Sequence, residues 1–145
     1  MTLCHLLLDI ETLGTDPNAV VLSIACVPFV LEVHTYFGEL VPAGFYVKLD
    51  VQEQIKTHHR SIEDGVMKWW KKQPKDVFDA MVRPSSEDMS IKEGLTLLNK
   101  FVSGIKNYNF NKSYVWSRGN NFDFPILKSL YQAAGIGLPY NVLVS

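Results

Sequence analysis

The feature that most constrains the fold is an apolar run near the N-terminus that ends in two carboxylates, Asp9 and Glu11. Residues 3–9 are almost continuously apolar, which is typical of a central β-strand buried on both faces. Side chains two positions apart on a strand share a face, so Asp9 and Glu11 are expected side by side at its C-terminal end. Such like charges repel unless a cation lies between them, and carboxylate oxygens suit Mg²⁺ or Mn²⁺. Asp-x-Glu alone is explained better by a strand that stops at a polar loop.

Length and composition indicate one globular domain, residues 1–145, with 47% hydrophobic and 20% charged residues. The formal net charge of -1 neither supports nor excludes a polyanionic partner. The longest apolar stretch, residues 19–31, is interrupted by a serine and a proline and is too short to span a bilayer. Cys4 and Cys26 lie in apolar runs without C-x-x-C spacing, which indicates reduced core residues. We therefore expect a cytoplasmic protein that does not contact membranes.

Turn signals and apolar runs predict further strands. Residues 19–29 are rich in Val and Ile, and the turn-rich loop 13–18 before them favours an antiparallel hairpin with the first strand. A third strand is expected over 35–41 and 45–49, bent or split by a Pro-Ala-Gly turn.

Two Ser-x-x-acid signatures, at Ser61 and Ser90, predict helix starts. The first would open a helix that Pro74 closes, and the second leads into an amphipathic helix ending near Ile105. Residues 76–81 could form another helical turn.

The last third of the chain predicts a short strand over 113–116, a loop, and a helix over 122–134. Pro125 is tolerated only in the first turn of that helix, and Gly135 is its stop signal. Three antiparallel strands, then helices, then a strand and a helix predict an α/β fold with a mixed sheet covered by helices.

A third carboxylate, Asp123, is expected in the first turn of the last helix. Asp is favoured at helix starts whatever the chemistry, so its presence there has an ordinary explanation. If the strand over 113–116 lies beside the first strand, however, Asp123 reaches the same edge as Asp9 and Glu11. Three converging carboxylates would indicate a metal site.

At these residues the sequence resembles a known family. Residues 9–15, Asp-Ile-Glu-Thr-Leu-Gly-Thr, resemble the first motif of the DEDD 3′→5′ exonucleases, which have a ribonuclease H-like fold. Residues 116–123, Trp-Ser-Arg-Gly-Asn-Asn-Phe-Asp, resemble the second motif, which carries the third acidic ligand. Residues 69–73, Trp-Trp-Lys-Lys-Gln, are similar to a stretch of the subgroup that includes phage exonuclease A. The resemblance spans about the whole chain.

The resemblance implies a metal-dependent 3′→5′ exonuclease. Such an enzyme hydrolyses terminal phosphodiester bonds of single-stranded DNA or RNA and releases nucleoside monophosphates. Asp9, Glu11 and Asp123 would be the catalytic residues and would ligate two Mg²⁺ or Mn²⁺ ions. The residues implied to bind substrate are Thr12, Leu13, Asn120 and Phe122.

The family's third motif, a His or Tyr base followed by a fourth Asp, has no match here. Residues 124–145 contain no Asp, Glu or His. We therefore expect an exonuclease domain that lacks its C-terminal strand and helix, binds metal weakly and hydrolyses slowly or not at all. The alternative is a non-catalytic domain that binds nucleic acid or a protein partner on the same scaffold. The apolar residues 136–145 could drive association into a homo-oligomer.

Other notable residues have simpler explanations. Trp69 and Trp70 are adjacent, so one should face the core and the other solvent, and core packing is favoured over base stacking. Four lysines lie on or just after that helix: Lys68, Lys71, Lys72 and Lys75. They could contact a phosphate backbone, although a solvated helix face is the default explanation. His58 and His59 are expected to be surface or capping residues, and Arg118 could neutralise a phosphate.

Overall fold

The computed structural model describes residues 3–31, 44–118 and 120–142. Within them, four strands form one sheet: β1 (His5–Thr12), β2 (Val21–Phe29), β3 (Phe45–Lys48) and β4 (Val115–Ser117). The strand order is β3-β2-β1-β4, in which β1, β2 and β3 pair antiparallel and β4 pairs with β1 in parallel. The predicted mixed sheet is confirmed, and the strand predicted over 35–41 lies outside the described residues.

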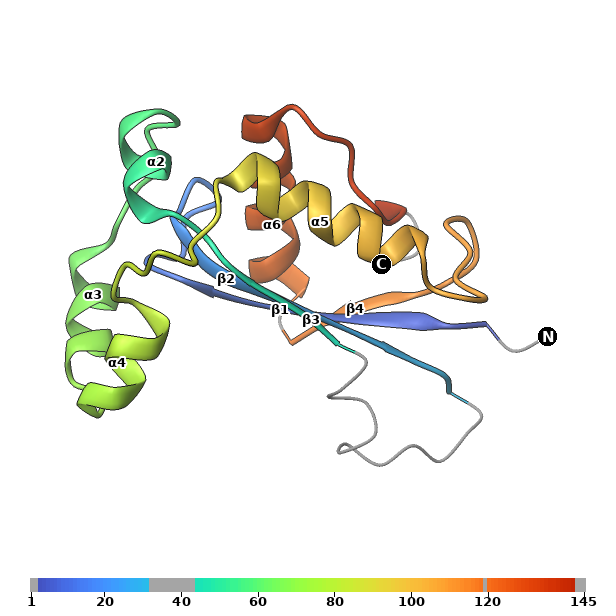
Figure 1. The fold of residues 1–145 in the computed structure, drawn as a ribbon, viewed down its shortest axis with the longest axis horizontal. Helices are drawn as coiled ribbons and strands as arrows, with labels where there is room; N and C mark the ends of the chain where they lie inside the picture. The colour runs from blue at the N-terminus through green and yellow to red at the C-terminus, as the bar shows by residue number, and fades with distance from the viewer. Residues whose placement is uncertain (1–2, 32–43, 119, 143–145) are drawn as a thin grey trace.

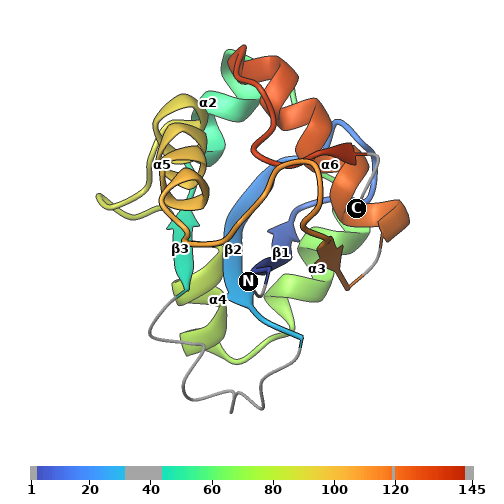
Figure 2. The same cartoon turned by 90° about the vertical axis from the view of Figure 1, so that its right-hand side faces the viewer.

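The helices of the described residues are α2 (Val51–Lys56), α3 (Asp64–Lys71), α4 (Lys75–Met81), α5 (Ile91–Ser103) and α6 (Asn120–Ala134). Figure 1 shows α5 and α6 on one face of the sheet, with α3 and α4 on the other side, at the end towards which β1 runs. Figure 2 shows the same division from the side. The sheet is therefore covered unequally on its two faces.

The main core lies between the sheet and helices α5 and α6. Leu6, Leu8 and Ile10 of β1 are at most 4% exposed and belong to this core. Burial of each such side chain stabilises the fold by about 1.5–3 kcal/mol. Because side chains alternate along a strand, the odd-numbered residues of β1 face away from α5 and α6.

A β-bulge separates the main core from a second one. The β1–β2 register pairs Glu11 with Ser23 and Thr12 with Val21, so Leu22 is the extra residue. The bulge reverses the alternation of side chains, and Val21 joins the main core whereas Leu22 joins the second. The second core also contains Leu13, Val20, Trp70 and Val82, and partly buried residues of α2, α3 and α4 pack against it.

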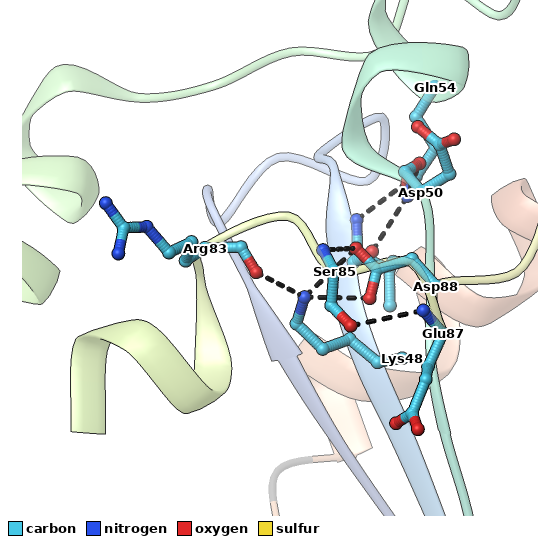
Figure 3. Close-up of polar contacts among 8 residues, drawn as sticks. Lys48, Asp50, Gln54, Arg83, Ser85, Glu87 and Asp88 are labelled. Atoms are coloured by element: carbon cyan, nitrogen blue, oxygen red, sulfur yellow. Dashed lines mark hydrogen bonds and ion pairs between the residues drawn. The ribbon is translucent and has the colours of Figure 1, made fainter. Parts of the chain in front are cut away.

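A partly buried ion pair joins β3 to the segment between α4 and α5. The Lys48 ammonium donates to both carboxylate oxygens of Asp88, at 2.9 and 3.0 Å, and to the carbonyl of Arg83 at 2.6 Å. Asp88 also accepts from the backbone N–H of Ser85, as Figure 3 shows. These bonds fix where the chain enters α5.

Two predicted helix starts had different outcomes. Ser90 caps α5 as predicted, because its hydroxyl accepts from the N–H of Glu93 at 3.1 Å. The capping prediction for Ser61 is wrong: α3 begins at Asp64, after Glu63 at the N-cap position. The backbone of Ser61 instead bridges the β1–β2 loop, donating to Asn18 and accepting from Val20.

The last helix begins earlier than predicted. It starts at Asn120, so Pro125 lies in its second turn and the prediction of a first-turn proline is wrong. Gly135 ends the helix as predicted, with a φ of 70°. The N–H of Ile136 donates to the carbonyl of Tyr131 and that of Gly135 to Gln132, which is a Schellman motif.

The close approach of α5 to β3 requires a glycine at position 94. A Cβ atom there would lie 2.6 Å from Cδ2 of Leu49 and 3.3 Å from Cγ2 of Val47. Both of these residues are buried in the main core, so the neighbours have little room to move.

We expect Gly94→Ala to lower the free energy of unfolding by about 1–3 kcal/mol through overpacking, measured by urea denaturation. The matched control is Gly65→Ala in α3, where a Cβ atom meets nothing within 4 Å. That substitution should be neutral or should stabilise by up to about 1 kcal/mol through helix propensity. Equal effects of the two substitutions would contradict the tight α5–β3 contact.

Candidate active site

Asp9 and Glu11 lie on the same face of β1, as predicted. They alternate with Leu8 and Ile10, which face the main core, so the two carboxylates project from the opposite face of the sheet. Both are partly exposed. The strand continues through them to Thr12, and the bulge follows Glu11 directly.

Asp123 is brought to β1 by the abrupt end of β4. The last parallel pair joins Leu8 to Ser117, so Ile10 lies beyond the end of β4 on that edge of β1. The Asp123 carboxylate hydrogen-bonds with the backbone of Ile10 instead, from the first turns of α6. Asp123 is only 3% exposed. The predicted approach of the third carboxylate to the first two is therefore observed in the backbone arrangement.

Two of the three carboxylates, Glu11 and Asp123, have raised pKa values, and the charge of Asp9 contributes to both shifts. Burial, followed by the charge of Asp9, raises the pKa of Asp123 to about 6, although the hydrogen bond with Ile10 opposes this and Glu11 adds to it. Burial and the charge of Asp9 also raise the pKa of Glu11, which Arg118 partly offsets. The site is thus an acidic cluster under mutual repulsion.

One carboxylate oxygen of this cluster lacks a partner. Oδ2 of Asp123 is buried and has no hydrogen bond. An unpaired buried anion is costly, and a divalent cation would satisfy it. The donor set, three carboxylates, is also the set that Mg²⁺ and Mn²⁺ prefer.

The side chains of the three carboxylates are not arranged as a metal-binding site. Among the described residues, no group of three or more His, Cys, Asp or Glu side chains is arranged so that it could hold a metal ion. The electrostatic coupling and the burial agree with the predicted ligand set, whereas the spacing of the side chains does not amount to a coordination shell. The metal-binding and catalytic roles of Asp9, Glu11 and Asp123 therefore stay predictions.

The segment after Glu11 is held by both ends of α3, through Trp70 in its last turn and Glu63 at its N-cap. The indole N–H of Trp70 donates to the carbonyl of Thr12 at 3.0 Å, and the N–H of Glu63 donates to the carbonyl of Leu13 at 2.9 Å. The N–H and the hydroxyl of Thr15 both donate to Oε1 of Glu63 at 2.7 Å. Sequence reasoning missed Glu63, because these bonds join residues 48 positions apart.

The predicted substrate-binding residues occupy different surroundings. Thr12 is 7% exposed and Leu13 1% exposed, with Leu13 in the second core. Phe122 packs against the main core, and Asn120 is the first residue of α6. Their contact with a nucleotide stays a prediction.

The adjacent tryptophans divide as predicted. Trp70 is 4% exposed and belongs to the second core, whereas Trp69 is 55% exposed. Of the two histidines, His58 has its Nε2 atom 3.7 Å from Oε2 of Glu53. His59 is exposed and has a φ of 52°. Both follow α2, in the segment that precedes α3.

Comparison with solved structures identifies the fold class. Over 95% of this chain, the structure is similar to Escherichia coli exonuclease I in complex with a dT13 oligonucleotide, with a TM-score of 0.57 and 12% identity, covering 25% of that chain. It is also similar to cell-death related nuclease 4, with a TM-score of 0.54 and 12% identity over 93% of this chain and 41% of that one. The predicted ribonuclease H-like fold is confirmed.

Sequence comparison identifies the family. The model of the 3′-5′ exoribonuclease Rv2179c-like domain matches residues 4–144, and the chain belongs to this family. An exodeoxyribonuclease of Enterobacteria phage T4 is 35% identical over 126 residues, which are 86% of this chain and 54% of the phage protein. The chain therefore spans about half the length of that relative. The predicted kinship with the DEDD exonucleases is confirmed.

Among the described residues, no helix has the length and apolar character needed to cross a membrane.

The raised pKa of Asp123 makes a testable prediction about stability and pH. Its folded value of about 6 exceeds the ordinary value of 3.8, so the folded state binds the proton more tightly. This contribution to stability is complete below pH 3.8 and is lost as the pH rises through about 6, with an upper limit of about 3 kcal/mol. We expect Asp123→Asn to become progressively more stable than the wild type between about pH 4 and 7.5, in urea denaturation with EDTA.

Asp76→Asn, an exposed acid in the first turn of α4, is the control and should follow the wild-type pH profile. Parallel profiles for Asp123→Asn and the wild type would show that the carboxylate is not destabilised by its surroundings.

Proposed function

We propose that this chain is the catalytic part of a metal-dependent 3′→5′ exonuclease that acts on single-stranded nucleic acid. The observation that carries the proposal is the buried Asp123 carboxylate, with one oxygen unpaired, beside two carboxylates on the neighbouring strand. In a member of an exoribonuclease-like family, such a cluster fits the binding of divalent ions that face a phosphate.

In this proposal each carboxylate has a distinct position. Asp9 is the carboxylate that raises the pKa of both of the others, so it lies between them electrostatically and suits a ligand shared by two ions. Glu11 borders the loop of Thr12 and Leu13 and would hold one ion next to the terminal nucleotide. Asp123 would hold the other. Bound Mg²⁺ or Mn²⁺ would supply an activated water and neutralise charge at the phosphate.

Arg118 extends the proposed site towards the substrate. Its charge lowers the pKa of Glu11, so the guanidinium lies within electrostatic reach of that carboxylate, and the side chain is exposed. An exposed arginine beside acidic ligands would bind a phosphate oxygen.

The names of the relatives do not decide whether the substrate is DNA or RNA. The family is described as exoribonucleases and the phage T4 relative as an exodeoxyribonuclease. The exonuclease I structure with dT13 gives a precedent for single strands. DNA and RNA oligonucleotides therefore both belong in the assay. Cytoplasmic location and self-association stay predictions.

The proposal predicts metal binding that depends on the acidic cluster. At pH 7.5, roughly 10 mM Mn²⁺ should raise the Tm of the wild type by about 2–5 °C. Asp9→Asn and Asp123→Asn should remove most of this shift, whereas Asp76→Asn should retain it. Equal shifts in all four proteins would place the bound metal elsewhere.

Activity is tested with 5′-labelled single-stranded DNA and RNA and Mn²⁺. We expect slow shortening from the 3′ end, abolished in Asp9→Asn, because residues 124–145 supply no further Asp, Glu or His. Rapid, complete laddering would contradict the expected weakness of this chain. Metal binding without any release of nucleoside monophosphate would favour the non-catalytic alternative.

A further inference from the structure

The surface of α3 combines an exposed aromatic ring with unpaired positive charge. Trp69 is 55% exposed, and Lys68, Lys71 and Lys72 beside it are exposed as well. The ion pairs of the described residues include none of these three lysines, whereas Lys75 is paired with Asp79 at 2.7 Å.

The charge of this surface is local. Lys68 and Lys71 lie in the last turn of α3 and Lys72 at its C-cap, whereas the acidic residue of the helix, Asp64, lies in its first turn. The chain as a whole has a formal net charge of -1. A helix face of this kind in an otherwise near-neutral protein is an electrostatic footprint for an anion, and a polyanion would engage several lysines together.

The α3 surface is connected by two contacts to the residue that follows Glu11. Trp70 donates its indole N–H to the carbonyl of Thr12, the residue after Glu11, at 3.0 Å. The rings of Trp69 and Trp70 meet edge to face, with centroids 5.0 Å apart and an interplanar angle of 79°. Trp69 is therefore two contacts away from the loop that follows Glu11.

The position of α3 in the fold agrees with such a role. It lies on the side of the sheet away from α5 and α6, at the end towards which β1 runs (Figures 1 and 2). Asp9 and Glu11 project from this same face of β1. A strand whose 3′ end lies at the carboxylates could continue over α3 without crossing the sheet.

We propose that the α3 surface formed by Lys68, Trp69, Lys71 and Lys72 binds the single strand upstream of the nucleotide held at the acidic cluster. Trp69 stacks on a base, and the lysines contact backbone phosphates. The inference rests on the proposed function for the direction of the strand. It assigns the favoured partner as a single-stranded nucleic acid because an acidic protein would use the lysines but would not need the exposed ring.

The experiment measures binding of a 5′-labelled dT12 and of an abasic 12-mer of equal charge by fluorescence anisotropy, in EDTA, so that no hydrolysis occurs. Trp69→Ala should weaken binding of dT12 by roughly tenfold and leave the abasic strand unaffected, since stacking needs bases. The double variant K71Q/K72Q should weaken both and reduce the slope of log affinity against log salt by about 1.4, or about 0.7 for each phosphate contact.

The control variants remove the same number of lysines, or one aromatic ring, from elements other than α3. The double variant K92Q/K100Q removes two exposed lysines from α5, on the opposite face of the sheet, and Phe110→Ala removes an exposed ring before β4. Both should bind dT12 like the wild type. Urea denaturation confirms that every variant is folded.

Several outcomes would overturn the proposal: no binding of dT12 by the wild type, equal losses in the α5 and α3 variants, or loss of dT12 and abasic binding alike in Trp69→Ala. Displacement of dT12 by an oligoglutamate peptide as readily as by dT12 itself would instead indicate an acidic protein partner. The Mn²⁺ assay is read separately. If binding depends on α3 but no nucleotide is released, the α3 surface is supported as a binding site and the proposed exonuclease activity is refuted. If nucleotide is released and the KM is unchanged in Trp69→Ala and K71Q/K72Q, the exonuclease activity is supported and the α3 binding site is refuted.

Discussion

The candidate site depends on the approach of the Asp123 carboxylate, in the first turns of α6, to the backbone of Ile10 in β1. On that edge β1 is unpaired beyond Leu8, because β4 has only three residues and its pairing with β1 ends at Leu8 and Ser117. The buried carboxylate of Asp123 therefore lies next to the residue between Asp9 and Glu11. Its electrostatic free energy is unfavourable there, and the packing of the rest of the fold offsets it.

The second constraint is the bulge after Glu11. Without it Leu22 would share a face with Ile24, two positions on; with it Val21 lies with Ile24 in the main core and Leu22 lies in the second core. The main core positions β1 and α6, which carry the acidic residues. The second core positions α3, whose Trp70 joins it to the loop after Glu11. One irregularity in the ladder thus connects the acidic cluster to the surface proposed to bind the strand.

Local patterns predicted much of the fold. The alternation of β1, the Ser90 cap and the Gly135 stop were predicted correctly, because each depends on residues within a few positions. The Ser61 cap was wrong because the backbone of that residue is used by the distant loop 16–20. The predicted start of α6 was wrong because Asp123, inside the helix, interacts with the backbone of Ile10 in β1, and no local signal records a contact over that separation.

The sequence by itself determined that Asp9 and Glu11 share a face, since a strand's period of two is a property of its own backbone, and its motifs determined the family. Only the tertiary structure decided that Asp123 is buried with one oxygen unpaired, that Glu63 holds the loop after Glu11, and which of the adjacent tryptophans is exposed. Each of these depends on contacts between segments about 50 to 110 residues apart, whose formation is decided by the packing of two cores rather than by local conformational preference.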